Sequence, residues 1–267
     1  MTEQTRIIVR EEAVRERSWL LRRQSDEGDY LFDAPTSIAM TSAANNKARG
    51  NEDGLTYYRD RSSSLESFIR RSIDIVGSAI LLIVLSPVLI FVGAAIFLMD
   101  PGPVIFRHRR MGRDGRQFSC LKFRSMYVGA ETRLSEVLDT HPELRAEWER
   151  EHKLSRDPRI TRIGRFLRAS SLDELPQLFN VLLGEMSLVG PRPIVSAEQV
   201  KYGKHIASYY AVKPGLTGLW QVSGRNDVNY RRRVAMDVVY CRTRSVTMDL
   251  WILMATVPAV IACRGAS

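Results

Sequence analysis

An uncharged run of 25 residues, Ile75–Met99, constrains this chain more than any other feature. At 1.5 Å per residue, an α-helix of that length crosses the ~30 Å hydrocarbon core of a bilayer, so the run predicts a membrane helix. Ser86 and Pro87 lie at its middle. Pro87 has no N–H to donate to the carbonyl of Ile83, so a bend is expected there, with Ser86 able to satisfy the freed backbone group.

Basic residues flank both ends of this run. Arg70 and Arg71 precede it, and Arg107, Arg109 and Arg110 follow it. Because Lys and Arg prefer the cytoplasmic side, both ends could lie there, and a bent helix can enter and leave a membrane by one face. A straight spanning helix that tolerates its proline explains the run equally well, so the residues alone leave both arrangements open.

The segment before the apolar run, residues 1–66, is rich in Arg, Glu, Ser, Asn and Gly, which predicts a mostly disordered extension. Its first thirty residues carry charges throughout and lack the apolar core of a secretory signal peptide. The three cysteines form no CxxC pair, so neither a disulfide framework nor a zinc site is indicated. The net charge of +9 suits anionic membranes, nucleic acids and phosphate-bearing ligands equally.

Beyond the apolar run, the pattern changes to short strands and polar helices. Val104–His108 alternates β-type residues, and Phe118–Phe123 follows a glycine-rich turn, which predicts a β-hairpin. Strong helix formers between Ala130 and Lys153 predict a solvated helical insertion. The apolar stretch Leu250–Cys263, at 14 residues, is too short to span a bilayer and is better interpreted as an interfacial or core helix.

A strongly basic amphipathic helix is predicted between these segments. Apolar residues recur at helical spacing while arginines fill the other positions, namely Ile160, Ile163, Phe166 and Leu167 against Arg159, Arg162, Arg165 and Arg168. Such a helix suits a membrane surface. Nucleic-acid binding is the competing interpretation of the same arginines, but no aromatic stacking pattern or base-reading motif accompanies them.

Two adjacent acids, Asp173 and Glu174, stand among leucines directly after this helix. Charged residues in an apolar neighbourhood need a reason. One reason is structural, because Ser171 and Glu174 have the spacing of a capping box. The other is chemical. Neighbours on a helix are poorly placed to share a proton, so separate roles are more natural, one carboxylate attacking phosphorus and the other helping to hold Mg²⁺.

Two rigid, glycine-bearing loops follow. In the first, Gly190-Pro191-Arg192-Pro193, one arginine is fixed between two prolines, and the second runs from Pro214 to Arg225. Glycines let a backbone approach a ligand closely, and guanidinium groups can grip phosphate with two parallel hydrogen bonds. Ordinary turn chemistry with solvated arginines is the alternative for each loop taken alone.

Taken together, these motifs resemble the monotopic phosphoglycosyl transferases, the bacterial sugar transferase family that initiates exopolysaccharide, O-antigen and glycoprotein glycan assembly. The resemblance runs from about Ser67 to Cys263 and rests on five ordered motifs: Ser86-Pro87, Leu121-Lys122-Phe123-Arg124-Ser125-Met126, Ser171-Leu172-Asp173-Glu174, Ser187 to Pro193, and Pro214 to Arg225. It implies a re-entrant helix, a catalytic domain on the cytoplasmic face of the inner membrane, and Mg²⁺ dependence.

The resemblance also implies roles for individual residues. Asp173 would attack the β-phosphorus of a UDP-sugar and release UMP, polyprenyl phosphate would then take the sugar phosphate from it, and Glu174 would be the metal ligand. Further active-site positions would be Lys122 and Arg168 as catalytic residues, and Pro191, Arg192, Gln221, Arg225 and Asp237 as substrate-binding residues, with Arg192 and Arg225 contacting phosphate or nucleotide.

We therefore expect an α+β, mainly helical fold with a re-entrant N-terminal membrane helix, a small β-hairpin, and amphipathic interfacial helices packed on a compact cytoplasmic catalytic domain. The expected division is a polar extension at 1–66, the membrane helix at 67–101, the catalytic domain at 102–246 and an interfacial helix at 247–267. Expected partners are a UDP-sugar, with a hexose favoured, undecaprenyl phosphate and inner-membrane lipids, but no nucleic acid. Homo-oligomers and polysaccharide-assembly partners stay open, and a non-catalytic membrane adaptor of polysaccharide export is the alternative function.

Overall fold

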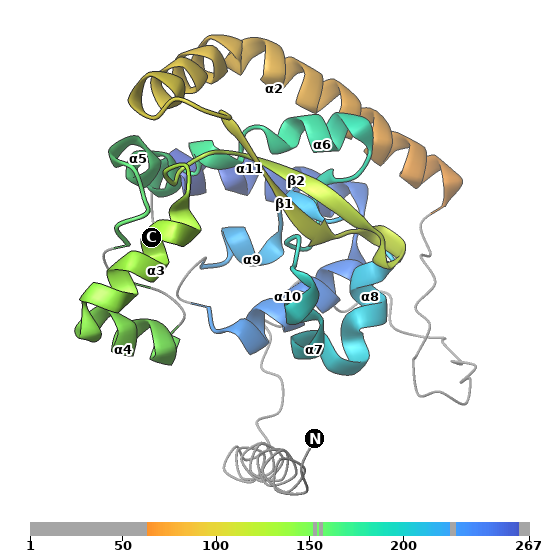
Figure 1. Cartoon of the computed structure of the whole chain (residues 1–267). Coiled ribbons are helices and arrows are strands. Elements are labelled where there is room, and N and C mark those ends of the chain that lie inside the picture. Colours follow the sequence, from red (N-terminus) through yellow and green to blue (C-terminus); the bar gives the residue numbers. More distant parts are fainter. Residues whose placement is uncertain (1–62, 152–153, 155–156, 225–227, 262–267) are drawn as a thin grey trace, which may run out of the picture. The chain divides into compact units, whose positions relative to one another are not determined.

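The computed structural model describes residues 63–151, 154, 157–224 and 228–261, which all lie within one compact unit, 49–267. Its helices outnumber its strands (Figure 1). The helices are α2 (Ser64–Met99), α3 (Ala130–Thr140), α4 (Pro142–Glu151), α5 (Arg162–Ser170), α6 (Gln177–Leu183), α7 (Gln199–Tyr202), α8 (Ile206–Tyr210), α9 (Leu219–Val222), α10 (Tyr230–Thr243) and α11 (Val246–Ile261). The strands are β1 (Ile105–Met111), β2 (Gln117–Phe123), β3 (Ser187–Val189) and β4 (Gly215–Thr217).

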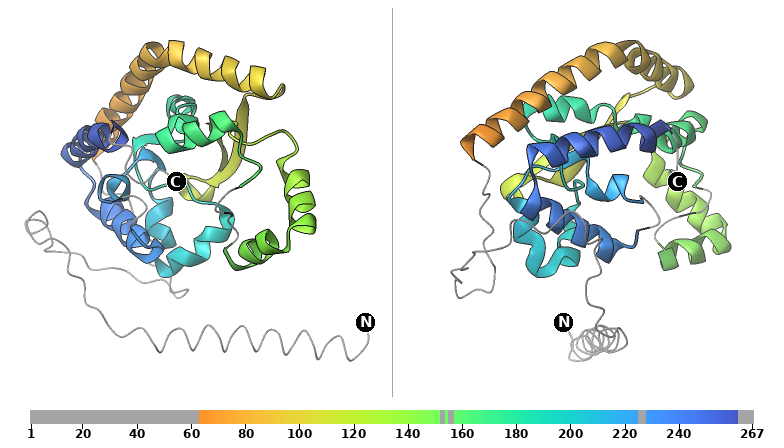
Figure 2. Two further views of the ribbon diagram at one scale, coloured as in Figure 1. Left: turned by 90° about the vertical axis from the view of Figure 1, so that its left-hand side faces the viewer. Right: turned by 180° about the vertical axis from the view of Figure 1, so that it is seen from behind.

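Helix α2 contains the predicted membrane segment and continues through Pro87. The Ser86 hydroxyl donates to the carbonyl of Ile83 at 2.7 Å, which supplies the bond that Pro87 cannot make. Figure 2 shows the helix bent near its middle, as expected. The helix begins at Ser64, a little earlier than predicted, because the Ser63 hydroxyl caps it by accepting from the Glu66 amide.

The surface of α2 is largely uncovered. Its most apolar 18-residue window has a mean hydropathy of 2.9, and only 11% of that window is buried. A core helix of a soluble protein would be mostly buried, so α2 fits membrane association better. Helices α6 and α11 lie beside α2, whereas α3 and α4 project on the opposite side of the unit (Figure 1).

Polar contacts attach the first half of α2 to the rest of the unit. Arg71 donates to the carbonyls of Val181 and Leu182, each at 2.7 Å, at the end of α6. Asp74 is buried and accepts from the amide of Leu188, the central residue of β3, at 2.8 Å. The second half of α2 packs instead by apolar contact, in a cluster of Val92, Ile96, Phe123 and Leu167.

Two small sheets complete the frame. Strands β1 and β2 pair antiparallel from Ile105↔Phe123 to Met111↔Gln117, which confirms the predicted hairpin. Strands β3 and β4 pair in parallel, a pairing that no sequence pattern indicated. The main apolar core lies between these sheets and helices α6, α10 and α11, and its buried members are Cys120, Leu178, Val181, Met186, Leu188, Val189, Val212, Tyr240, Cys241 and Ile252.

Other predicted helices also have different bounds in the structure, including α11, which begins at Val246 and not at Leu250. The basic helix starts at Arg162, so Arg159 and Ile160 lie before it, because the Thr161 hydroxyl caps the helix by accepting from the Gly164 amide at 2.8 Å. The helical insertion is divided into α3 and α4, and Pro142 begins the second helix, a position that a proline tolerates well.

Candidate active site

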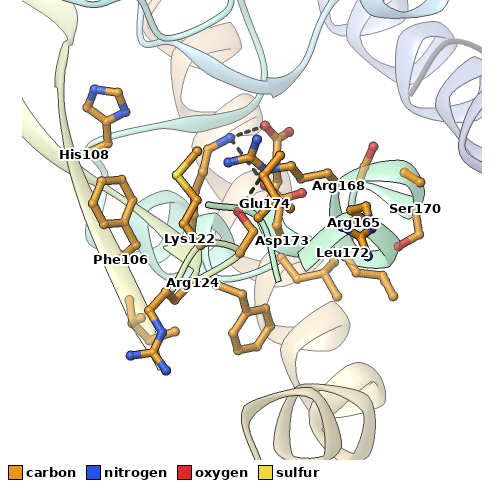
Figure 3. Close-up of a pocket in the computed structure, with 18 of the residues that line it drawn as sticks. Phe106, His108, Lys122, Arg124, Arg165, Arg168, Ser170, Leu172, Asp173 and Glu174 are labelled. Atoms are coloured by element: carbon orange, nitrogen blue, oxygen red, sulfur yellow. Dashed lines mark hydrogen bonds and ion pairs between the residues drawn. The ribbon is translucent and has the colours of Figure 1, made fainter. Parts of the chain in front are cut away.

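The two adjacent acids face a lysine that lies about fifty residues earlier in the chain. Lys122 Nζ lies 2.6 Å from Glu174 Oε1 and 3.8 Å from Asp173 Oδ2 (Figure 3). Lys122 belongs to β2 and stands directly across the hairpin from Phe106. Because opposed residues of an antiparallel pair point to the same face of the sheet, both side chains line one cavity with the acids.

The chain between α5 and Asp173 turns sharply. Ser171 ends α5 in the left-handed conformation with φ of 59°, and a single 3₁₀ turn, Leu172–Glu174, follows. Ser171 makes no capping bond with its side chain there, and the Glu174 carboxylate contacts Lys122 instead. The capping-box interpretation of Glu174 is therefore wrong. A left-handed residue other than glycine costs conformational energy and is enriched near functional sites.

Charge and burial act in opposite directions on the two acids. Burial raises the pKa of Asp173, the Lys122 ammonium lowers it, and the neighbouring Glu174 carboxylate raises it again, with a net rise. Burial would also raise the pKa of Glu174, but Lys122 and Arg192 outweigh it and hold that pKa below its usual range. The pair therefore carries two unlike carboxylates, Glu174 being the more readily ionised.

Helix α5 packs directly onto the segment after β2. A Cβ added at Gly164 would lie 1.9 Å from the carbonyl oxygen of Ser125, so only glycine fits at this crossing. The same Ser125 accepts from Arg168 Nε through its hydroxyl, at 2.9 Å. Arg168 thus lines the cavity near Asp173, and its charge lowers the pKa of that acid.

The Pro-Arg-Pro loop is fixed from both sides. Arg110 on β1 donates to the Pro193 carbonyl at 3.1 Å. Pro191 is fully buried, and its carbonyl accepts from the Gly215 amide at 2.8 Å. Arg192 itself is exposed, lines the cavity and lies 5.7 Å from the centre of the Trp220 ring. The loop therefore presents one guanidinium to the cavity from a rigid backbone.

The other three predicted residues of the site, Gln221, Asp237 and Arg225, differ in how the structure places them. Gln221 lines the cavity, and its buried Oε1 has no hydrogen-bond partner among the described residues. Asp237 is 3% exposed, accepts from the Tyr202 hydroxyl at 2.7 Å and is not among the described residues that line the cavity. Burial raises the pKa of Asp237 to about 7. Arg225 lies outside the described residues.

Four residues near this site received no site role in the sequence analysis. His108 and Arg110 line the cavity, and His108 Nδ1 lies 3.2 Å from Arg110 Nη2. Their alternation with Phe106 along β1 could have revealed them, because period-two spacing puts all three on one face of the hairpin. Ser125 lies in the motif Leu121–Met126, but nothing in the motif assigned it a role of its own. Arg233, which lies 4.6 Å from the Trp220 ring centre, gave no such signal.

The donor groups suit a magnesium ion more than a transition metal. Across the part of the chain that the structure describes, no three His, Cys, Asp or Glu side chains gather as a metal site. Mg²⁺ needs no such cage, since it is usually bound by one or two carboxylates together with water and substrate phosphates. Asp173 and Glu174 supply two such carboxylates in the cavity. The cavity also has room for a large substrate, because its volume of about 1780 Å³ exceeds the ~300–1,000 Å³ of most small-molecule sites.

Comparison with known proteins decides the family. The model of the bacterial sugar transferase family matches residues 65–263. The chain belongs to this family. A bacterial sugar transferase of Salmonella typhimurium, named undecaprenyl-phosphate galactose phosphotransferase, is 51% identical over 199 residues, which cover 74% of this chain and 42% of that protein.

Two further relatives are closer in length to the chain. The exopolysaccharide production protein ExoY of Rhizobium meliloti is 45% identical over 196 residues, 73% of this chain and 87% of that protein. The UDP-glucose:undecaprenyl-phosphate glucose-1-phosphate transferase of Caulobacter vibrioides is 40% identical over 205 residues, 74% of this chain and 71% of that protein. By contrast, the chain spans only 42% of the length of the relatives from Salmonella typhimurium and Erwinia amylovora.

Proposed function

We propose that this bacterial sugar transferase is a phosphoglycosyl transferase, which moves a hexose 1-phosphate from a UDP-hexose to undecaprenyl phosphate in exopolysaccharide or related glycan synthesis. The observation that carries the proposal is the contact of Lys122 with the paired acids Asp173 and Glu174. The names of the relatives support the substrates, because they specify galactose or glucose transfer to undecaprenyl phosphate.

The reaction divides into two displacements at one phosphorus. In the first, an Asp173 carboxylate oxygen bonds to the phosphorus that carries the sugar, and the bond from that phosphorus to the bridging oxygen breaks. UMP leaves with that oxygen and its electron pair. In the second, an oxygen of undecaprenyl phosphate bonds to the same phosphorus and the Asp173 carboxylate leaves, which yields undecaprenyl diphosphosugar.

The cationic residues of the cavity suit this chemistry. Lys122 and Arg168 both lower the pKa of Asp173, so they favour the ionised carboxylate that the first displacement needs. Arg192 projects from a fixed loop and can pair with diphosphate oxygens as charge develops on the leaving group. A bound Mg²⁺ would neutralise part of the diphosphate charge, and Glu174 would be the residue that holds it, Lys122 then being free to pair with phosphate.

We further propose that α2 is re-entrant, so that both ends of the helix and the catalytic domain lie on the cytoplasmic face of the inner membrane. The bend in α2, the Ser86 hydroxyl bond to Ile83 and the basic residues on both sides of the apolar run support this arrangement. The exposed apolar side chains of α11 would lie in the interface beside it.

The function is tested by Asp173→Asn in purified protein supplied with Mg²⁺, undecaprenyl phosphate and a panel of UDP-sugars. Wild-type protein is expected to release UMP, and intact-mass spectrometry without acceptor should show a sugar phosphate added. Asp173→Asn should abolish both signals while its melting temperature is maintained, because an amide is a far poorer nucleophile. UMP release by the variant at the wild-type rate would refute Asp173 as the nucleophile, whereas silence of the wild type across the panel would favour the adaptor function instead.

The membrane arrangement is tested by Pro87→Leu. This variant restores the hydrogen bond to Ile83 and should straighten α2, which tends to move one end of the helix to the periplasm. Val88→Leu is the matched control, because it changes the adjacent exposed residue and keeps the proline. Accessibility of single cysteines placed at the two ends of α2 is the measurement, and identical labelling of both variants would contradict a bend that governs topology.

A further inference from the structure

The cavity that contains the acids has a second, apolar end. Its wall there comes from α2 and α11, with the small parallel sheet between them, and consists of Leu81, Leu188, Leu216, Leu253, Thr256 and Val257. We propose that this apolar end, the α2–α11 groove, binds the isoprenoid chain of the polyprenyl phosphate acceptor next to its phosphate. The inference rests on the proposed function and assigns a place to one of its two substrates.

The polar groups in this wall are already satisfied. The Thr256 hydroxyl donates to the Ile252 carbonyl at 2.7 Å. The Thr217 hydroxyl lies 2.8 Å from the Thr256 hydroxyl oxygen and can donate to it. The α2–α11 groove therefore offers methyl and methylene groups to a ligand. A hexose or a uridine placed there would lose hydrogen bonds to water without compensation, whereas a hydrocarbon chain would not.

The other end of the same cavity identifies the rest of the ligand. It offers Lys122, Arg168 and Arg192, three cations that suit a phosphate, beside the acid that would carry the sugar phosphate. A ligand that fits both ends has one phosphate head and one apolar chain. Polyprenyl phosphate has this form, while a UDP-sugar has no part that suits the apolar end.

The α2–α11 groove is also continuous with the lipid-facing surface. Both helices that form it carry exposed apolar residues on their outer sides, including Ile80 on α2 and Met254 on α11. A lipid in the bilayer could therefore bring its phosphate to Asp173 while its far isoprene units stay in the membrane. Figure 3 shows the charged end of the cavity, with Lys122 in contact with Asp173 and Glu174.

Tryptophan substitutions separate this proposal from the function on which it rests. Val257→Trp and Leu81→Trp would fill the groove from opposite helices, at side chains that are 58% and 40% exposed and so tolerate a larger residue. Met254→Trp and Ile80→Trp are the controls, because they lie on the same helices at 76% and 54% exposure but outside the cavity wall.

Each variant is assayed in two half-reactions with UDP-galactose and UDP-glucose. Without acceptor, the amount of UMP released per enzyme should be unchanged in all four variants, which also reports that each is folded. With undecaprenyl phosphate, transfer by Val257→Trp and Leu81→Trp should fall at least ~10-fold, as expected when a bulky side chain occupies a fitted apolar site, while the controls keep the wild-type rate.

Two results would overturn the assignment. Normal transfer by both groove variants would mean that the chain lies elsewhere, and loss of UMP release in both would mean that these positions serve the donor or the fold. Failure of the proposed function is distinct from either, since the wild type would then release no UMP at all.

Discussion

Asp237 is the residue whose substitution makes the sharpest quantitative prediction, because its carboxylate is buried and only half satisfied. Its Oδ2 accepts from Tyr202, but its Oδ1 has no hydrogen-bond partner among the described residues. Burial raises its pKa from 3.8 to about 7, although the Tyr202 bond and the charges of Arg192 and Arg233 oppose the rise. The substitution Asp237→Asn keeps the shape of the side chain and removes the charge.

The sign follows from where the proton is held. An unfolded chain ionises Asp237 near pH 3.8, whereas the folded protein keeps it protonated up to about pH 7. The folded state therefore binds the proton more tightly than the unfolded state. As pH rises from about 4 to 7, Asp237 lowers the free energy of unfolding progressively, and above about pH 7 this contribution stays constant. Asparagine has no proton to lose, so it removes this dependence.

The size of the effect is set by the two pKa values. One pKa unit corresponds to about 1.4 kcal/mol, so the ionisable Asp237 costs the fold about 2 kcal/mol at pH 5 and about 4 kcal/mol at pH 8. The stability of Asp237→Asn relative to the wild type should thus rise by about 2–3 kcal/mol between these two pH values. For a protein of this size that is a gain in relative melting temperature on the order of 5–10 °C.

The assay is thermal unfolding in detergent at pH 5, 6, 7 and 8, always as the difference between variant and wild type. Other buried acids titrate in both proteins and cancel in that difference. Asp139→Asn is the surface control, because the Asp139 side chain is 70% exposed and its contact with Arg145 is screened by solvent. A flat profile for Asp237→Asn would refute a buried carboxyl that titrates near neutrality.

Two further predictions concern the charged end of the cavity. Gly164→Ala places a methyl group 1.9 Å from the Ser125 carbonyl oxygen, so α5 must move by more than 1 Å, and we expect a loss of ~1–3 kcal/mol in stability and on the order of 100-fold in kcat. Gly93→Ala is the control, because its Cβ would lie 3.5 Å from Val104, and it should keep wild-type activity. Equal rates for the two variants would contradict the close packing at Gly164. Lys122→Gln removes the cation that lowers the pKa of Asp173 and of Glu174, so both pKa values rise and the acid limb of the pH–kcat profile should move to higher pH. An unshifted limb with a lower plateau would mean that Lys122 acts on the substrate alone.

Local patterns in the sequence predicted the elements that carry their own signals. The alternation before and after Gly112 predicted the hairpin, and the proline at 87 predicted both the bend and the role of Ser86. The adjacent acids at 173 and 174 indicated a catalytic pair, and the capping box was an equally local alternative for Glu174. The structure resolved it because the deciding contact, Lys122 to Glu174, joins segments 52 residues apart, a separation that no local pattern reports.

Other features lay beyond the sequence for physical reasons. Strands β3 and β4 have three residues each, too few to show a period, and their pairing depends on Gly190 and Gly215 meeting backbone to backbone. The burial of Asp237 depends on Tyr202, which approaches from a separate helix. In both cases the partner is distant in the chain, so the information lies in the packing and not in the segment.

Under the proposed function, the attachment of α2 would couple the membrane helix to the reaction at phosphorus. Arg71 bonds to the end of α6, the helix that follows the 3₁₀ turn carrying Asp173, and Asp74 bonds to β3, which leads directly into the Pro-Arg-Pro loop. Both partners are backbone groups, so a shift of α2 relative to either element would leave the part-buried Arg71 or the buried Asp74 without these bonds. The first half of α2 is therefore fastened to the two elements that present Asp173 and Arg192, and in the proposed membrane arrangement the depth of the helix would set the depth of the site.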